Sequence, residues 1–196
     1  MTLTAMLRAG GESRRMGTDK AALVFNGETL WERQLRLLKS LEPQTLCLSA
    51  RARPAWCPDN VETILDASPS RGPLSGIAAG LSHIHTSHLL VLAVDMPRMS
   101  LEHLNKLINL ARPGSGVVPV KNDLFEPLCA IYPYEAVTTA MKVLARGDTA
   151  LQSFIQALRA AEQVRTYPLS EFEFTLYQNL NTPGDLMVTI DERIGS

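Results

Sequence analysis

Residues 88–95 read HLLVLAVD, and this stretch decides the fold. Its apolar run is uninterrupted and ends in an aspartate, Asp95. A short continuous apolar run is typical of a strand that is buried on both faces, as the central strands of parallel sheets are when helices cover them. We therefore expect residues 88–95 to form the central strand of an α/β sheet, with the Asp95 carboxylate at its carboxyl end.

Strand-like runs and helical patterns alternate along the rest of the chain. The expected strands are 3–7, 45–50, 61–66, 88–95, 116–120 and 127–132, and the expected helices are 29–43, 72–84, 100–112, 134–145 and 149–161. A further segment, 164–169, leads to a final helix that we expect to begin near Pro183. This alternation predicts a three-layer, Rossmann-like α/β fold, with helices on both faces of a mostly parallel twisted sheet and a mixed-direction edge near the C-terminus.

Composition limits the kind of protein this is. The 196 residues contain no repeat or flexible linker, so we expect a single domain spanning residues 1–196. A formal net charge of -1 gives no reason to expect a nucleic-acid or membrane partner. The three cysteines form no CxxC pair, which favours a reducing compartment. The N-terminus lacks the pattern of a signal peptide, and we expect a cytoplasmic protein.

A glycine-rich loop with basic residues follows the first expected strand. Residues 6–20 read MLRAGGESRRMGTDK, which fits neither the GxxxxGK[ST] nor the GxGxxG phosphate loop. The backbone N–H groups of Gly10 and Gly11 can approach a nucleotide closely, and Arg15 and Lys20 can neutralise a triphosphate. Ligands of such sheets bind at the carboxyl ends of the strands, so this loop and Asp95 are expected on one edge.

Several segments carry a family resemblance. AGGESRRMGTDK resembles the A-G-G-x-S-x-R-M-G-x-D-K signature of the nucleotidyltransferases that make molybdenum cofactor guanine dinucleotide; the matching residues are Ala9, Gly10, Gly11, Ser13, Arg15, Met16, Gly17, Asp19 and Lys20. The segments ILDASPSRGPLSG (64–76), VLAVDMP (91–97), FEPLCAIYP (125–133) and NLNTPGDL (179–186) resemble later motifs of the same family, in the same order. The resemblance therefore extends from Leu7 to Leu186.

The resemblance implies a nucleotidyltransferase fold and an Mg²⁺-dependent enzyme that transfers GMP from GTP to molybdenum-molybdopterin and releases pyrophosphate. The N-terminal part would bind the nucleotide and the C-terminal part the pterin. The implied catalytic residues are Arg15, Lys20 and Asp95, with Asp95 as the Mg²⁺ ligand. The implied nucleotide-binding residues are Arg8, Ala9, Gly10, Gly11, Lys20, Ser49, Asp66 and Asp95, and Arg71 would add charge nearby. Asn179 and Asn181 would bind the pterin, and Glu126 and Pro127 would line the substrate side. Molybdoenzymes or other cofactor-biosynthesis proteins would be partners.

Two positions depart from the family's pattern. Arg8 stands where the family has leucine, and Ser49 stands where a member has asparagine. An arginine at the end of the first strand must point out of the core or toward the ligand, because burying an unpaired guanidinium is costly. Two other functions therefore stay open. One is a cytidylyl- or sugar-phosphate nucleotidyltransferase, and the other is a non-catalytic adaptor that binds nucleotide or pterin.

Overall fold

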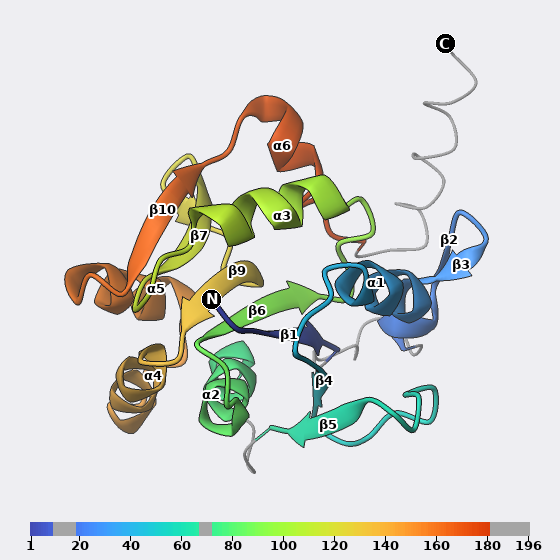
Figure 1. Cartoon of the computed structure of the whole chain (residues 1–196), viewed down its shortest axis with the longest axis horizontal. Coiled ribbons are helices and arrows are strands. Elements are labelled where there is room, and N and C mark those ends of the chain that lie inside the picture. The colour runs from blue at the N-terminus through green and yellow to red at the C-terminus, as the bar shows by residue number, and fades with distance from the viewer. Residues whose placement is uncertain (10–18, 67–71, 181–196) are drawn as a thin grey trace.

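The computed structural model describes residues 1–9, 19–66 and 72–180, drawn in colour in Figure 1. The strands are β1 (Leu3–Arg8), β2 (Val24–Phe25), β3 (Glu28–Thr29), β4 (Thr45–Ala50), β5 (Glu62–Leu65), β6 (His88–Ala93), β7 (Gly116–Lys121), β8 (Leu124–Phe125), β9 (Cys129–Pro133) and β10 (Val164–Pro168). The helices are the 3₁₀ helix η2 (Lys20–Ala22) and the α-helices α1 (Leu30–Lys39), α2 (Pro73–His83), α3 (Leu101–Leu110), α4 (Ala136–Ala145), α5 (Leu151–Ala160) and α6 (Glu171–Thr175). The helix expected from Pro183 lies outside the described residues.

The main sheet has the strand order β10-β7-β9-β6-β1-β4-β5, and β8 pairs with β7 at its side. β6 stands in the middle with all six residues buried, so the prediction of a central strand is confirmed. β1 runs parallel to both β6 and β4, and β4 runs parallel to β5. Figure 1 shows β5 and β10 at opposite ends of the sheet.

The strand that reverses direction is not at an edge of the sheet, so that prediction was wrong. β9 lies inside the sheet, antiparallel to both β6 and β7, whereas the edge strand β10 is parallel to its neighbour β7. The physical reason is the length of the connection. Only residues 122–128 separate β7 from β9, and the chain turns back through β8 within them, whereas a parallel crossover needs about a dozen residues or more.

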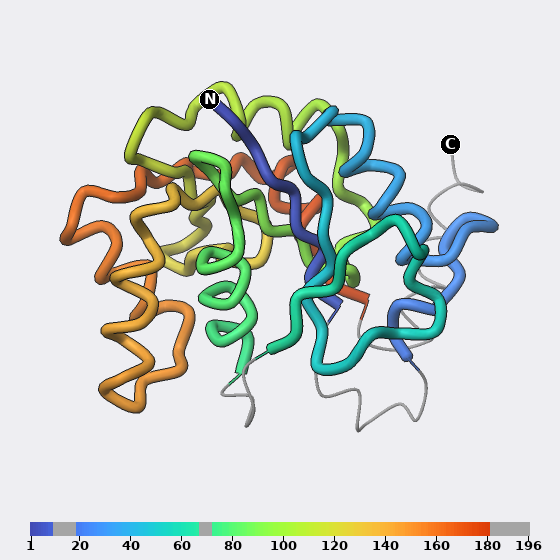
Figure 2. Tube along the Cα trace, turned by 60° about the horizontal axis from the view of Figure 1, so that its bottom comes forward, coloured from blue at the N-terminus to red at the C-terminus, as the bar shows by residue number. Residues whose placement is uncertain are grey.

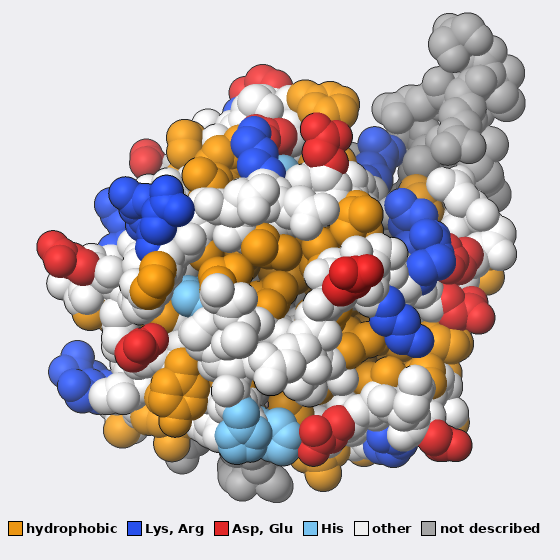
Figure 3. All heavy atoms as spheres, in the orientation of Figure 1, with side chains coloured by type: hydrophobic (Ala, Val, Ile, Leu, Met, Phe, Trp, Pro, Cys, Tyr) orange, Lys and Arg blue, Asp and Glu red, His pale blue; other side chains and the backbone are white. Residues whose placement is uncertain are grey.

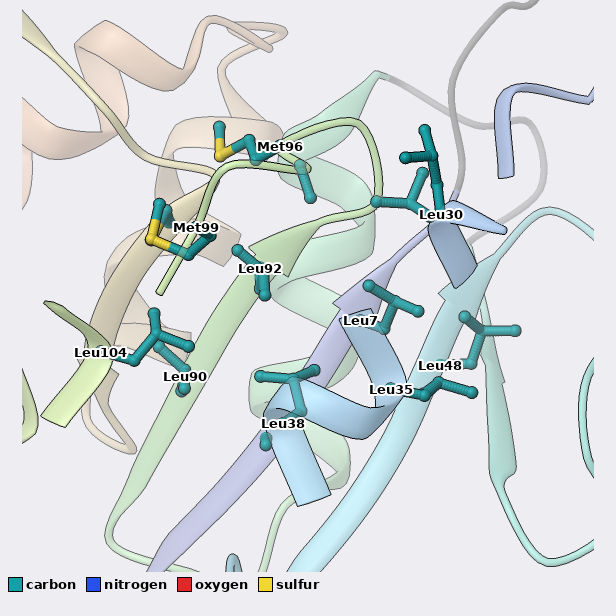
Figure 4. Close-up of a cluster of buried hydrophobic side chains, with 14 of the residues drawn as sticks. Leu7, Leu30, Leu35, Leu38, Leu48, Leu90, Leu92, Met96, Met99 and Leu104 are labelled. Carbon is teal, nitrogen blue, oxygen red and sulfur yellow. The ribbon is translucent and has the colours of Figure 1, made fainter. Parts of the chain in front are cut away.

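Helices cover both faces of the sheet, as expected from the alternation of elements. Leu90 and Leu92 of β6 belong to the core that includes α1 and α3, whereas Leu89 and Val91 belong to the core with α2, α4 and α5. Figure 2 shows α1 and α3 on one side of the sheet and α2 and α4 on the other. In the first core, leucines of α1 point toward the leucines of β1 and β4 (Figure 4).

Helix starts follow the local sequence. The Thr29 side chain accepts a hydrogen bond from Glu32 N while Glu32 reaches back to the Thr29 backbone, which forms a capping box at the start of α1. Ser100 caps α3 by accepting a hydrogen bond from His103 N. These caps fix where α1 and α3 begin, and therefore how the loops at the carboxyl edge of the sheet enter them.

A candidate nucleotide site at the carboxyl edge of the sheet

The carboxyl ends of four neighbouring parallel strands bring together residues that are distant in the sequence. Arg8 ends β1 and pairs in register with Ser49 of β4 and Ala93 of β6. The ladder continues beyond the strands, with Val94 N donating to Arg8 O at 3.0 Å and Asp66 N donating to Ala50 O at 3.0 Å. Arg8, Ser49, Asp66 and Asp95 therefore share one edge of the sheet, as the sequence predicted.

Lys20 reaches the same edge and meets Asp95. The Lys20 Nζ donates to Asp95 Oδ2 at 3.3 Å. The two side chains are 25% and 20% exposed, so both are partly desolvated yet accessible from solvent. A mobile ammonium beside a carboxylate at a sheet edge is suited to a phosphate-bearing ligand, because each group can contribute to charge neutralisation. Lys20, the last residue of the glycine-rich stretch, thus lies on the same edge as Asp95, as expected, and the contact between the two side chains is a finding of the structure.

The first helix holds the backbone just after Asp95. Gln34 Nε2 donates to the carbonyl of Met96 at 2.5 Å, and Arg33 Nε donates to the carbonyl of Pro97 at 2.5 Å. Gln34 is fully buried, so its hydrogen bond to the Met96 carbonyl lies in the core rather than at the surface. The turn that carries Asp95 is therefore fixed from behind by α1, and sequence reasoning missed this role of Arg33 and Gln34.

Arg8 is buried and paired, which differs from both expected orientations. Its Nη2 donates to Asp66 Oδ2 at 2.9 Å, and the Arg8 and Asp66 side chains are 4% and 1% exposed. Ser49 Oγ donates to the other carboxylate oxygen, Asp66 Oδ1, at 3.1 Å. Burial lowers the pKa of Arg8, and Asp66 opposes this in part. The guanidinium stays inside because it has a carboxylate partner, so its burial carries no unpaired charge.

Helix α2 closes the other side of this Arg8–Ser49–Asp66 cluster. A Cβ at Gly76 would lie 2.8 Å from both Arg8 Nε and Ser49 Oγ. Arg8 Nε is itself buried without a hydrogen-bond partner among the described residues. The helix begins after Gly72, whose φ of +80° is a backbone conformation that favours glycine. The absence of a side chain at Gly76 therefore lets α2 lie close against the cluster.

The predicted substrate-side residues lie beside the same edge. Ala93 N donates to Leu128 O at 2.8 Å, which places the segment 126–128 next to the end of β6. Pro127 is buried and Glu126 is half-buried, and burial raises the pKa of the Glu126 carboxyl. Leu180 N donates to Asp95 O at 3.0 Å, so the exposed Asn179 is adjacent in sequence to a residue bound to the Asp95 backbone.

Of the other predicted site residues, the structure describes Ala9. Its backbone N–H donates to Ser49 O at 3.0 Å. The remaining predicted positions lie outside the described residues; these are Gly10, Gly11, Arg15, Arg71 and Asn181.

The site residues fit a magnesium ion held mainly by substrate. Among the described ranges, no group of three or more His, Cys, Asp and Glu side chains is arranged to hold a metal ion. Asp95 instead offers one accessible carboxylate beside the partly exposed Lys20. Mg²⁺ is usually held by one or two carboxylates together with substrate phosphates and water, and a single aspartate fits this pattern.

The surface shown in Figure 3 carries both signs of charge. Acidic and basic side chains are interspersed around hydrophobic ones on this face. In the part of the chain that the structure describes, no helix is both long and apolar enough to cross a lipid bilayer.

Comparisons with known proteins agree with this geometry. A family model described as "MobA-like NTP transferase domain" matches residues 5–164. A protein of Opitutus terrae named "Probable molybdenum cofactor guanylyltransferase" is 39% identical over 93% of this chain and 92% of its own length. A Chloroflexus aggregans protein of the same name is 32% identical over 95% of this chain and 92% of its own.

A solved structure is similar over the whole fold. The crystal structure of molybdopterin-guanine dinucleotide biosynthesis protein A from Archaeoglobus fulgidus superimposes with a TM-score of 0.73 at 26% sequence identity. The match covers 97% of this chain and 99% of that one. This chain and that protein therefore share the same overall architecture.

Proposed function

Because this chain belongs to the MobA-like NTP transferase family, we propose that it is a molybdenum cofactor guanylyltransferase. It transfers GMP from GTP to the phosphate of molybdenum-molybdopterin, which yields the guanine dinucleotide cofactor and pyrophosphate. The observation that carries the proposal is the Lys20–Asp95 pair, 3.3 Å apart at the carboxyl edge of the sheet. This is where nucleotides bind in open α/β folds.

The chemistry is a displacement at phosphorus. An oxygen of the pterin phosphate forms a bond to the α-phosphorus of GTP, the bond from that phosphorus to the bridging oxygen breaks, and pyrophosphate leaves. The protein supplies positioning and charge neutralisation rather than a covalent partner. Lys20, together with Arg15, neutralises the triphosphate and the departing pyrophosphate. Asp95 would hold Mg²⁺, and the bound ion would neutralise further phosphate charge.

The distribution of charge along this edge indicates which end of the nucleotide would lie where. Arg8 and Asp66 neutralise each other in the buried cluster, so this end suits the uncharged base and sugar. Lys20 marks the end that suits the phosphates. Ala9, Gly10 and Gly11 would line the path between them with backbone groups. Asn179 and Asn181 would bind the pterin, with Glu126 and Pro127 on the substrate side.

The state of the three cysteines bears on the compartment in which the enzyme would act. Cys47, Cys57 and Cys129 are all free and buried, which is compatible with a reducing compartment. We place the enzyme in the cytoplasm, where molybdoenzymes or other cofactor-biosynthesis proteins would receive its product.

The proposal is tested with the purified protein, Mg²⁺ and each of GTP, CTP, ATP and UTP. Thermal stability should rise most with GTP, and pyrophosphate should appear when molybdenum-molybdopterin is added. A larger stabilisation by CTP would make the protein a cytidylyltransferase. GTP binding without pyrophosphate release in the presence of loaded pterin would make it a non-catalytic adaptor.

A further inference from the structure

A hydrogen bond from a tryptophan on a distant loop fixes the residue that precedes Lys20. Trp56 Nε1 donates to Asp19 Oδ2 at 2.7 Å, across 37 residues of sequence. Trp56 lies in the connection between β4 and β5, far from the glycine-rich loop in the chain. This contact ties the start of η2 to a separate part of the fold.

Asp19 uses its other oxygen to build the helical turn that presents Lys20. As the N-cap of η2, its Oδ1 accepts from Ala21 N at 3.0 Å, and Ala21 is fully buried. Both carboxylate oxygens are therefore engaged, one by the turn and one by Trp56. The Asp19 carboxylate therefore links Trp56 to the turn whose first residue is Lys20.

The tryptophan is itself held against the first helix. The rings of Trp56 and Trp31 are stacked with centroids 5.2 Å apart and planes 18° from parallel. Trp31 belongs to α1, the same helix whose Arg33 and Gln34 donate to the backbone after Asp95. Helix α1 thus supports both partners of the Lys20–Asp95 pair, one through the tryptophan stack and Asp19, the other directly.

We propose that Trp56 is a positioning residue for guanylyl transfer, whose indole N–H, acting through Asp19, holds Lys20 at Asp95. The expected effect on kcat rests on the proposed function, whereas the expected effect on the position of Lys20 does not. The indole donor matters because an N–H bonded to a carboxylate makes a stronger and more directional contact than ring packing alone.

The kinetic test uses Trp56→Phe, which keeps an aromatic ring for stacking and removes the N–H. We expect kcat to fall about tenfold, equivalent to about 1.4 kcal/mol of transition-state stabilisation, with little change in KM for GTP. Thr139→Val is the matched control. It removes a side-chain hydrogen bond of the same 2.7 Å length, to Gln163 Oε1, away from the site, and kcat should be unchanged.

A cycle with Asp19→Asn shows whether Trp56 acts through Asp19. If it does, the double variant is no slower than Asp19→Asn alone, because the interaction has already been lost. Fully additive losses would contradict the proposed route. Fluorescence of Trp31, the remaining tryptophan in Trp56→Phe, verifies that α1 is still packed.

A second readout does not depend on guanylyl transfer. The rate at which an amine-specific reagent labels Lys20 is measured by mass spectrometry, with the exposed Lys39 as internal reference. Labelling of Lys20 should become several-fold faster in Trp56→Phe and stay unchanged in Thr139→Val. Equal Lys20 labelling in wild type and Trp56→Phe would overturn the proposal. Failure of the wild type to transfer GMP would instead overturn the proposed function and leave the labelling result to decide the role of Trp56.

Discussion

The ammonium of Lys20 lies 3.3 Å from Oδ2 of Asp95, although 75 residues separate them in the sequence. Lys20 ends the glycine-rich stretch and begins η2, whereas Asp95 follows the central strand, so the fold brings both residues to the same edge of the sheet. The pair contains both signs of charge that a nucleotide with a bound Mg²⁺ requires. It is the part of the molecule on which the proposed chemistry depends most.

Removing either member of this pair should nearly abolish activity. Lys20→Ala and Asp95→Ala are each expected to lower kcat by about a hundredfold or more, because preorganised charge at the reacting phosphates is lost. Lys39→Ala, at an exposed lysine on α1, is the control and should retain wild-type turnover. Steady-state pyrophosphate release measures all three. Wild-type rates in either site variant would exclude the assigned roles.

Because Arg8 forms a buried ion pair with Asp66, we expect it to stabilise the folded protein in addition to lying at the candidate site. Arg8→Leu leaves the Asp66 carboxylate buried without its charged partner, and the free energy of unfolding should fall by about 3–5 kcal/mol. Urea denaturation measures the loss. Replacing Asp66 by Asn in the same chain removes the stranded charge and should recover part of it. An Arg8→Leu protein as stable as wild type would show that the Asp66 charge is not buried against Arg8.

Two glycines of α2 offer a matched steric comparison. Gly76→Ala places a methyl group 2.8 Å from Arg8 Nε and Ser49 Oγ, atoms that the buried cluster holds in place, and should cost about 1–3 kcal/mol of stability. Gly80→Ala places one 2.6 Å from Met6 Sδ, near the end of a flexible side chain that can move. The loss of unfolding free energy, measured by urea denaturation, should therefore be smaller for Gly80→Ala than for Gly76→Ala. The reverse order would show that Arg8 and Ser49 are not held rigidly in the cluster.

Stability should fall with acid in a way that depends on His103. Burial lowers the pKa of His103 from its usual 6.5, although Glu173, with Oε1 3.7 Å from Nδ1, opposes the effect and Lys106 adds to it. The unfolded chain therefore takes up a proton at a higher pH than the folded one. Stability from this group is present above the unfolded pKa and is lost as the pH falls.

The variant His103→Gln isolates this contribution, because glutamine can still reach toward the Tyr177 hydroxyl that lies 2.7 Å from Nε2. Unfolding free energies of wild type and variant, measured between about pH 7.5 and about pH 5.5, should converge as the pH falls through the range in which histidine titrates. Curves that stay parallel over this range would show that His103 does not titrate with a lowered pKa.

The sequence predicted the features that depend on local pattern and strand direction. HLLVLAVD was recognisable as a central strand because only a strand covered on both faces tolerates six buried residues in succession. Asp95 and Lys20 were expected on one edge because parallel strands end together. The partners inside that edge were not predictable. Nothing in the sequence shows that Asp66, 58 residues away, turns inward to meet Arg8.

Some missed elements did have a local signal. Asn26-Gly27 forms the positive-φ turn of the β2–β3 hairpin, and Asn-Gly is a strong hairpin signal, but strands of two residues carry no periodicity. Asn122 and Asp123 make the corresponding turn before β8. The capping box of Ser170 and Glu173 marks the start of α6. The role of Trp56 had no such signal, because it depends on a side-chain contact between distant segments.

Guanylyl transfer is tested by following the phosphorus atoms of GTP into the products. Purified protein is incubated with Mg²⁺, molybdenum-molybdopterin and GTP labelled at either the α- or the γ-phosphorus, and the products are separated. The account predicts that the α-label enters the pterin dinucleotide and the γ-label enters pyrophosphate, in wild type but not in Lys20→Ala. An α-label that never reaches the pterin, or equal transfer by Lys20→Ala, would contradict it.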